Sequence, residues 1–583
     1  MKSARPAGAG IRLLAILATA SLAACAPVAS GDDSGRGGAP AIGNGGSSGS
    51  GIGGSPGGGR GTIGGFAGSS GTAGVGGNPP GAGGGTGGSA TATGGFSGNG
   101  GAVAGASGIS GSGGGGAASG SGGASGGGGT SGAGPQSGVI LNDRFWKDTA
   151  GTPIYSQGGG VLQVENTFYW YGVKYRGAVA YAANPAGGDV DDTTFQGVTI
   201  YSSKNLSDWA LENTVMFSNA GGWFGRLGVV YHAATRKYVL VAQGGGGLYF
   251  ATSDTPNGTF RFDNIQTNLP GIVNGSTGDQ TTFQDDDGQA YLISSSSSGR
   301  ANRYVSPLRG SDYLSVENAV LVYRGTGREG NCMFKHAGTY YFCSSDLHGW
   351  NASQTYCVSA SNIRGPYSAE FVLDGTAADF SHVTQTGFFI SVRGTARNTI
   401  IFAGDRWSDF AGNGLGYNQW MPLSFTGSTP RMESLSAWSI DTATGDWRVA
   451  PQNNYALNPS FEADRVEMTQ PAGWTTANSA TSTDGRTGRW GWGLSATSTL
   501  NQRLTGLPNG TYTLSVWVKA TGAGASLSAK GFGGADKTVA MGSASAWTNV
   551  SIPGISVSNG QCEISVATSG QTVTVDDFTL IRD

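Results

Sequence analysis

Residues 168–171 read Phe-Tyr-Trp-Tyr, a short aromatic run that follows a turn, and its recurrence decides the fold class. Four similar runs follow turns at roughly 50-to-70-residue intervals, at residues 237–241, 290–293, 339–342 and 399–402. That interval suits a four-stranded blade with its loops, and long helical periodicity is missing. The repeat therefore predicts an all-β chain with a five-bladed β-propeller over residues 139–451. A large β-sandwich or a β-helix is the alternative.

The sequence pattern changes again near residue 452. Residues 512–518 read Tyr-Thr-Leu-Ser-Val-Trp-Val, an alternation of polar and apolar positions typical of a half-buried strand. Residues 452–583 are therefore expected to form a second domain, a β-sandwich of the jelly-roll type.

The first 24 residues have the pattern of a secretion signal, with Lys2 and Arg5 ahead of an apolar run too short to span a bilayer stably. Residues 22–25 read Leu-Ala-Ala-Cys, which resembles the bacterial lipobox, so Cys25 is expected to be lipidated. An ordinary signal peptide with a chance cysteine is the alternative. Ala26, rather than Asp, follows the cysteine. We therefore expect an outer-membrane lipoprotein that faces the periplasm or the cell surface.

Residues 25–138 are dominated by Gly, Ser and Ala and hold a large part of the chain's 107 glycines. Such a segment buries too little apolar area to offset the entropy of ordering it. The sequence therefore predicts a disordered tether between the lipid anchor and the folded domains.

Composition excludes several function classes. The net charge is −3 and no block of Lys and Arg occurs, so nucleic-acid binding has no electrostatic support. Four histidines and five scattered cysteines argue against a zinc site or a disulfide scaffold. One disulfide is expected among Cys332, Cys343 and Cys357, with the pair left open. We expect a monomer without a catalytic cofactor.

A propeller offers a funnel along its axis, and hydrolysis of a glycosidic bond there needs a proton donor and a base for water. Asp279, Glu329 and Asp405 stand near expected strands and are the candidate carboxylates. Each also has a structural interpretation, and for Asp405 this is an ion pair with Arg406.

The stretches around these carboxylates resemble glycoside hydrolase family 43, and within it the exo-β-1,3-galactanase branch, from about Trp146 to Val449. The resemblance is carried by motifs at residues 146–148, 158–162, 169–172, 197–203, 251–253, 279–288, 329–335, 345–351, 365–367 and 404–407. It implies a five-bladed propeller and inversion at the anomeric carbon.

The resemblance also implies roles for single residues. Glu329 matches the general acid, and Asp279 matches the carboxylate that raises the pKa of the acid and orients it. The first-strand Asp that serves as base in most of the family is replaced by Gly158-Gly159-Gly160. Gln385 matches the Gln that positions or activates water in the galactanase branch, and Asp148 is the reserve base.

Sugar recognition departs from the branch at three positions. Gln157 replaces a His, Val173 replaces a Glu, and Gly225 replaces a Glu ahead of Arg226. Loss of polar groups that bind hydroxyls changes specificity sharply. The residues expected to contact sugar are Arg226, Trp170, Trp350 and Trp407, with core packing as the alternative for each tryptophan.

The last domain resembles jelly-roll carbohydrate-binding modules, with Asn-Pro-Ser-Phe-Glu at residues 458–462 and Asp-Asp-Phe at 576–578. That resemblance implies a structural calcium ion held by Glu462 and Asp577, since calcium prefers oxygen ligands. Helix capping or edge-strand charge is the alternative.

Together these features predict a surface-tethered, inverting glycoside hydrolase that is exo-acting on β-1,3-galactan or a related plant polysaccharide. Two alternatives remain open. One is an α-L-arabinofuranosidase, β-xylosidase or β-galactofuranosidase of the same family, and the other is a non-catalytic glycan-binding lipoprotein.

Overall fold

The computed structural model describes residues 137–583 except 185–191, 219–222, 245, 350, 407–416, 463–470 and 483. The expected signal peptide, Cys25 and most of the Gly-rich tether therefore lie outside the described residues. In the part that is described, no helix combines the length and the apolar character needed to cross a membrane.

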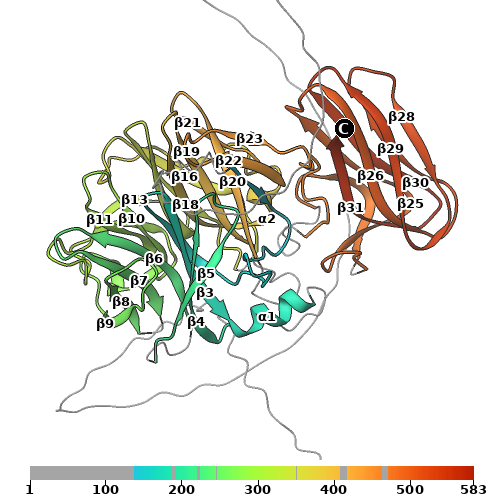
Figure 1. The fold of residues 1–583 in the computed structure, drawn as a ribbon. Coiled ribbons are helices and arrows are strands. Elements are labelled where there is room, and N and C mark those ends of the chain that lie inside the picture. The colour runs from blue at the N-terminus through green and yellow to red at the C-terminus, as the bar shows by residue number, and fades with distance from the viewer. Residues whose placement is uncertain are drawn as a thin grey trace, which may run out of the picture. The chain divides into compact units, whose positions relative to one another are not determined.

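Five four-stranded antiparallel sheets follow one another along the chain (Figure 1). Their strands are β2 (Gln157–Val164), β3 (Thr167–Tyr175), β4 (Phe195–Ser203) and β5 (Ala210–Val215); β6 (Phe224–His232), β7 (Lys237–Gly244), β8 (Gly247–Ser253) and β9 (Arg261–Gln266); β10 (Thr277–Gln284), β11 (Ala290–Ser296), β12 (Asn302–Pro307) and β13 (Val320–Arg324); β14 (Glu329–His336), β15 (Thr339–Ser345), β16 (Thr355–Ala360) and β17 (Phe371–Val372); β18 (Gln385–Arg393), β19 (Asn398–Arg406), β20 (Tyr417–Thr426) and β21 (Thr429–Met432).

The first strand of each sheet is the inner one. β2, β6, β10, β14 and β18 contact one another in that order, and β18 contacts β2, which closes the ring. The five aromatic runs of the sequence lie in the second strands, β3, β7, β11, β15 and β19. Those runs were therefore predicted correctly as strands of successive blades.

Five blades were predicted, and that count was wrong, because the propeller-like arrangement contains six sheets. Five of them supply the inner strands that close the ring. The sixth is three-stranded and joins β1 (Ser137–Leu141) to β22 (Ala437–Asp441) and β23 (Trp447–Val449). It pairs residues about 300 positions apart, as in Ile140 opposite Trp438. No local pattern announces such a pairing, so the sequence showed only the five consecutive units.

The C-terminal domain is one eight-stranded antiparallel sheet whose edge strands β28 and β29 contact each other, so that the sheet curls around its own apolar core (Figure 1). Its strands are β24 (Thr475–Ser482), β25 (Gly491–Thr505), β26 (Gly510–Ala520), β27 (Ala525–Lys530), β28 (Lys537–Met541), β29 (Ala544–Val557), β30 (Gln561–Ser569) and β31 (Val573–Arg582). Helical turns in the described residues are short: α1 (Arg176–Ala183), α2 (Phe380–Val383) and the 3-10 turn Val273–Gly275.

Candidate active site

The five inner strands share one irregularity near their beginnings. Each carries one extra residue relative to its second strand, a β-bulge, as between Gln157 and Gly160 in β2 and between Glu329 and Cys332 in β14. The same shift occurs in β6, β10 and β18. A bulge bends its strand and redirects the side chains beside it. Repetition at one level of the ring brings polar residues of several blades together.

Glu329 and Asp279 meet at this level and share a cation. Arg300, from the loop between β11 and β12, donates from Nη1 to Oε2 of Glu329 and lies 3.4 Å from Oδ1 of Asp279. Oδ2 of Asp279 accepts the backbone N–H of Gly330 at 3.1 Å. The side chains of Glu329 and Asp279 are 9% and 15% exposed, so the pair is mostly buried but open on one side.

The two carboxyl groups are driven to opposite protonation states. Burial raises the pKa of Glu329 to about 8, and the charge of Asp279 adds to the rise. Burial alone would also raise the pKa of Asp279, but Arg226 and Arg300 outweigh it and lower that pKa. At neutral pH Glu329 therefore holds a proton beside an ionised Asp279. A general acid must be protonated before the reaction, and an ionised neighbour keeps it so.

Arg226 is the buried centre of the cluster. Its side chain is 4% exposed, and its guanidinium lies 3.1 Å from Oδ2 of Asp279 and 3.2 Å from Oδ2 of Asp405. It also donates to Oε1 of Gln385. Both terminal nitrogens of Arg226 are thus engaged by neighbouring residues of the cluster, and its contact with substrate stays a prediction.

Gln385 contacts the expected acid directly. Its Nε2 donates to Oε1 of Glu329 at 2.9 Å and to the carbonyl oxygen of Gly349 at 3.1 Å. The amide oxygen accepts from Arg226, so both ends of the amide are engaged. In this state Gln385 orients the carboxyl group of Glu329.

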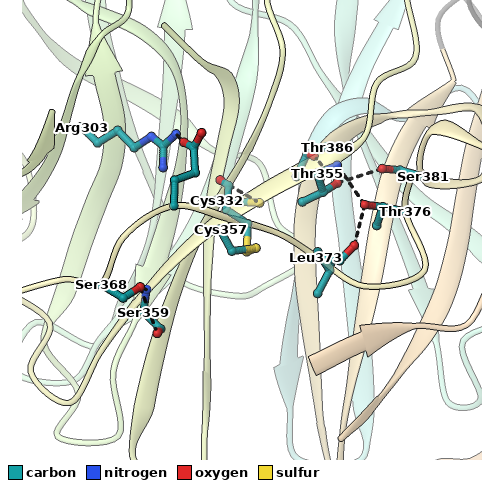
Figure 2. The surroundings of a disulfide bond; sticks show 12 residues. Arg303, Cys332, Thr355, Cys357, Ser359, Ser368, Leu373, Thr376, Ser381 and Thr386 are labelled. Atoms are coloured by element: carbon teal, nitrogen blue, oxygen red, sulfur yellow. Dashed lines mark hydrogen bonds and ion pairs between the residues drawn. A yellow bond between two sulfur atoms is a disulfide. The ribbon is translucent and has the colours of Figure 1, made fainter. Parts of the chain in front are cut away.

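A left-handed turn lies directly before β18, the strand that begins with Gln385. All four residues of α2, Phe380–Val383, have φ between 53° and 60°, a conformation that costs L-residues roughly 1–2 kcal/mol each. Figure 2 shows the hydroxyl groups that hold this turn: Oγ1 of Thr355 hydrogen-bonds Ser381 Oγ and Thr386 Oγ1, each at 2.9 Å. Strain held in this way is found at functional sites.

The strand that carries Thr355 is cross-linked to its neighbour. Cys343 of β15 and Cys357 of β16 form a disulfide, and Cys332 of β14 is a buried free thiol (Figure 2). One disulfide among these three cysteines was predicted, and the structure selects the pair. It ties together two strands of the blade whose inner strand begins with Glu329.

Other candidates lie elsewhere. Asp148 is in the turn before β2, where Oδ1 accepts the backbone N–H groups of Ala150 and Thr152, both at 2.9 Å, so the structure does not bring this reserve base into the cluster. Trp170 is 0% exposed and packs against Trp209 and Trp420, so its prediction as a sugar-contacting residue was wrong. Trp350 and Trp407 lie outside the described residues.

Arg300 is the site residue that the sequence did not reveal. It is a non-glycine residue with φ of 50° at the end of a Ser- and Gly-rich loop, and its side chain is 30% exposed. Its contacts with Asp279 and Glu329 depend on how two blades approach each other, so no local motif marks it.

A cavity of about 530 Å³ lies along the inner strands. It is lined by the residues after the bulges, among them Gly160, Leu227, Thr281 and Phe388. None of the paired acidic groups at the bulges lines this cavity. We therefore place the chemistry at the carboxylate cluster and not in this cavity.

The expected calcium ligands belong to the C-terminal domain. Oε1 of Glu462 accepts the backbone N–H groups of Arg489 at 3.0 Å and Trp490 at 2.7 Å, while Asp577 pairs with Arg486 at 2.6 Å. Among the described residues, no three His, Cys, Asp or Glu side chains form a metal-binding group. A cation at Asp577 would have to take the place of the Arg486 guanidinium, and the calcium ion stays a prediction.

Comparison with known proteins gives a consistent result for the propeller. Residues 161–387 match the family model described as glycosyl hydrolases family 43. An exo-β-1,3-galactanase of Phanerochaete chrysosporium, crystallised with galactose, is 23% identical with a TM-score of 0.50, covering 76% of this chain and 100% of that chain. A variant of that enzyme with β-1,3-galactotriose gives the same identity and TM-score over 76% of this chain and 99% of that one.

An exo-β-1,3-galactanase of Clostridium thermocellum is 19% identical, with a TM-score of 0.47, over 76% of this chain and 100% of that chain. No match was found among curated proteins. At 23% identity the Phanerochaete chrysosporium structures show the shared fold alone.

Proposed function

We propose that the propeller, whose residues 161–387 match the family model described as glycosyl hydrolases family 43, is a glycosidase domain that removes galactose from the ends of β-1,3-galactan or a related plant polysaccharide. One observation carries this proposal: Glu329, with a pKa of about 8, is held against an ionised Asp279 by a partly exposed guanidinium. The fold is shared with enzymes that bind galactose and β-1,3-galactotriose, which favours galactan among the substrates of the family.

In the proposed reaction Glu329 gives its proton to the glycosidic oxygen as that bond breaks, and water attacks the anomeric carbon from the opposite face, which inverts the configuration. The surplus proton of the attacking water passes to bulk solvent, and Glu329 takes a proton back from solvent before the next turnover. Asp279 keeps the proton on Glu329 until the leaving oxygen takes it. Gln385 is the water-positioning residue of the proposal. That role requires its amide to exchange one of its present partners, Glu329 or Arg226, for water.

The substrate is tested by product release from the full chain on β-1,3-galactan, arabinan, xylan and aryl glycosides, with Glu329→Gln as the control. Galactose released by wild type and lost in the variant supports the proposal. Arabinose, xylose or galactofuranose released instead would assign one of the alternative specificities, which the changes at Gln157, Val173 and Gly225 keep open. Glycan binding without release would leave a tethered binding protein.

We further propose that lipidated Cys25 anchors this monomeric enzyme to the outer membrane, with the Gly-rich segment as its tether. The support is the Leu-Ala-Ala-Cys motif and the composition of residues 25–138. Cys25→Ala should move the protein from the membrane fraction to the soluble fraction, and mass spectrometry of the mature N-terminus would identify the acyl chains. A wild-type protein without acyl chains would overturn the anchor.

The C-terminal domain is proposed to be a jelly-roll carbohydrate-binding module with a structural calcium ion. Binding of galactan to the Glu329→Gln variant, with and without calcium chelation, tests both parts. A melting temperature that does not respond to chelation or to added calcium would remove the ion from the proposal.

A further inference from the structure

We propose that Asp405 is a positioning residue of the glycosidase. It pairs with Nη1 of Arg226, and Arg226 in turn holds Asp279 and Gln385 in place beside Glu329. This inference rests on the proposed function and deepens it. Asp405 lies in β19, the second strand of its blade, directly opposite Gln385 in the register. It is therefore placed to act on the site without touching substrate.

The carboxylate of Asp405 is bound on two sides and closed to solvent. Oδ1 accepts the backbone N–H of Gly158 at 3.0 Å, and Oδ2 pairs with Nη1 of Arg226 at 3.2 Å. Its side chain is 1% exposed. The ion pair with Arg406 that the sequence left open is not among its contacts; Arg406 lies over the ring of Tyr417 and near Asp143.

Two glycines leave room for this pair. A Cβ atom at Gly158 would lie 3.3 Å from the backbone nitrogen of Arg226, and a Cβ atom at Gly387 would lie 3.0 Å from Oδ2 of Asp405 and 2.7 Å from the carbonyl oxygen of Ala403. Gly158 also stands in the stretch where most of family 43 carries its base. In this chain a Cβ atom at Gly158 would face Arg226, and the backbone N–H of Gly158 donates to a carboxylate from another blade.

The guanidinium of Arg226 divides its donors between the two sides. Nη1 faces Asp405, whereas Nη2 lies 3.1 Å from Oδ2 of Asp279 and donates to the amide oxygen of Gln385. Because the fork of an arginine is planar and rigid, fixing one nitrogen fixes the direction of the other. Asp405 therefore sets where Asp279 and Gln385 stand relative to Glu329.

Asp405 also controls how much positive charge reaches the acid. The charged groups that act on Glu329 are Asp279 from β10, Arg226 from β6, Arg300 from the β11–β12 loop and His348 after β15. Burial raises the pKa of Asp405, and the charge of Arg226 opposes that rise. While Asp405 is ionised, Arg226 is shared between two anions. Without that charge, Arg226 would stabilise the ionised form of Glu329 more strongly and favour loss of its proton.

The test is Asp405→Asn in the full chain, with kcat and KM followed against pH. We expect kcat to fall about 10²-fold with little change in KM, because the acid is misplaced but the sugar contacts are kept. The basic limb of kcat/KM should move to lower pH by about one unit, because Arg226 then stabilises the ionised form of Glu329 more strongly and lowers its pKa. A basic limb that stays at the wild-type pH would overturn the proposal.

Two further variants separate positioning from general damage. Asp285→Asn removes a carboxylate that pairs with Lys335 at 2.7 Å beyond the other end of β10, and it should leave the basic limb in place. Asp405→Glu keeps the charge and should lower kcat without moving the limb. If Asp405→Asn does not fold, a displaced limb in Asp405→Glu alone would overturn the proposal.

A readout without turnover distinguishes failure of this inference from failure of the proposed function. The pH dependence of the melting temperature, compared with and without Glu329→Gln, reports the pKa of Glu329. That comparison is made in the wild-type and Asp405→Asn backgrounds. A lower pKa of Glu329 in the Asp405→Asn background supports the role of Asp405 even if no substrate is hydrolysed. Equal pKa values of Glu329 in the two backgrounds would contradict it.

Discussion

The propeller and the C-terminal domain each bury a pair of carboxyl groups, and the two pairs look alike in their titration. Burial and a neighbouring carboxylate raise the pKa of Glu329 beside Asp279 to about 8, and burial and a neighbouring carboxylate do the same for Asp576 beside Asp577. A raised pKa alone would therefore assign an acid to both domains.

The donors around the two pairs differ. Asp576 is 0% exposed, and its Oδ2 accepts the backbone N–H groups of Arg486 at 2.6 Å and Thr487 at 3.1 Å, so it closes a loop. Glu329 is held by side chains, and Arg300 beside it is 30% exposed. Backbone donors hold Asp576 in a closed loop. Side chains from separate strands hold Glu329, and the partial exposure of Arg300 beside it leaves room for a substrate. The surroundings, more than the pKa, distinguish the two pairs.

The largest expected effect separates the two pairs by activity. Asp279→Asn removes the anion that keeps the proton on Glu329 while Arg226 and Arg300 remain, so Glu329 ionises and the rate should fall about 10²-fold or more. Asp577→Asn makes the same change in the other pair and should leave the rate unchanged. Initial rates of sugar release check both, and a similar loss in the two variants would mean that the pairs are not functionally distinct.

The pH profile of the wild type should report Glu329 and not Asp576. Because burial raises the pKa of Glu329 to about 8, its proton is present below that pH and lost above it. The value of kcat/KM should therefore fall about tenfold for each pH unit above 8. The profile should be the same in Asp576→Asn, and a basic limb that moves in that variant would break the comparison.

Stability should report Asp576. Its pKa is about 8 in the folded domain and 3.8 in the unfolded chain, so the folded state binds this proton more tightly. The stabilisation is complete below pH 4 and is lost as the pH rises through 8. In Asp576→Asn the melting temperature of the C-terminal domain should fall about 5 °C less than in wild type between pH 5 and 8. Parallel curves would show that Asp576 does not titrate in this range.

The smallest expected effect is a shift of the pH profile on removal of the arginine beside each carboxyl pair, Arg300 in the propeller and Arg486 in the C-terminal domain. Arg300 lowers the pKa of Glu329, so Arg300→Gln should move the basic limb of kcat/KM upward by about half a unit, a shift kept small by the partial exposure of the side chain. Arg486→Gln removes the cation beside Asp577 and should leave the limb in place. A downward shift in Arg300→Gln would contradict the charge assignment.

The sequence predicted elements whose signals are local. The five aromatic runs gave the second strands, since alternation and turns act over a few residues. Glu329 and Asp279 were proposed as the acid and its neighbour because the short motifs around them resemble those of a known family. The sixth sheet was missed because its partners are about 300 positions apart, as Ile140 and Trp438 are. The burial of Arg226 among Asp279, Asp405 and Gln385 was not predicted, because contacts with three other strands cannot be seen in Gly225-Arg226.

By itself, the sequence determined the all-β class, the repeated blade units and the change to a second domain. These features depend on periodicity and composition, which each segment carries alone. Only the tertiary structure decided that Cys343 pairs with Cys357, that Arg300 bridges Glu329 and Asp279, and that Asp405 pairs with Arg226. Those contacts join different strands and blades, and their distances are set by ring closure and by the five bulges.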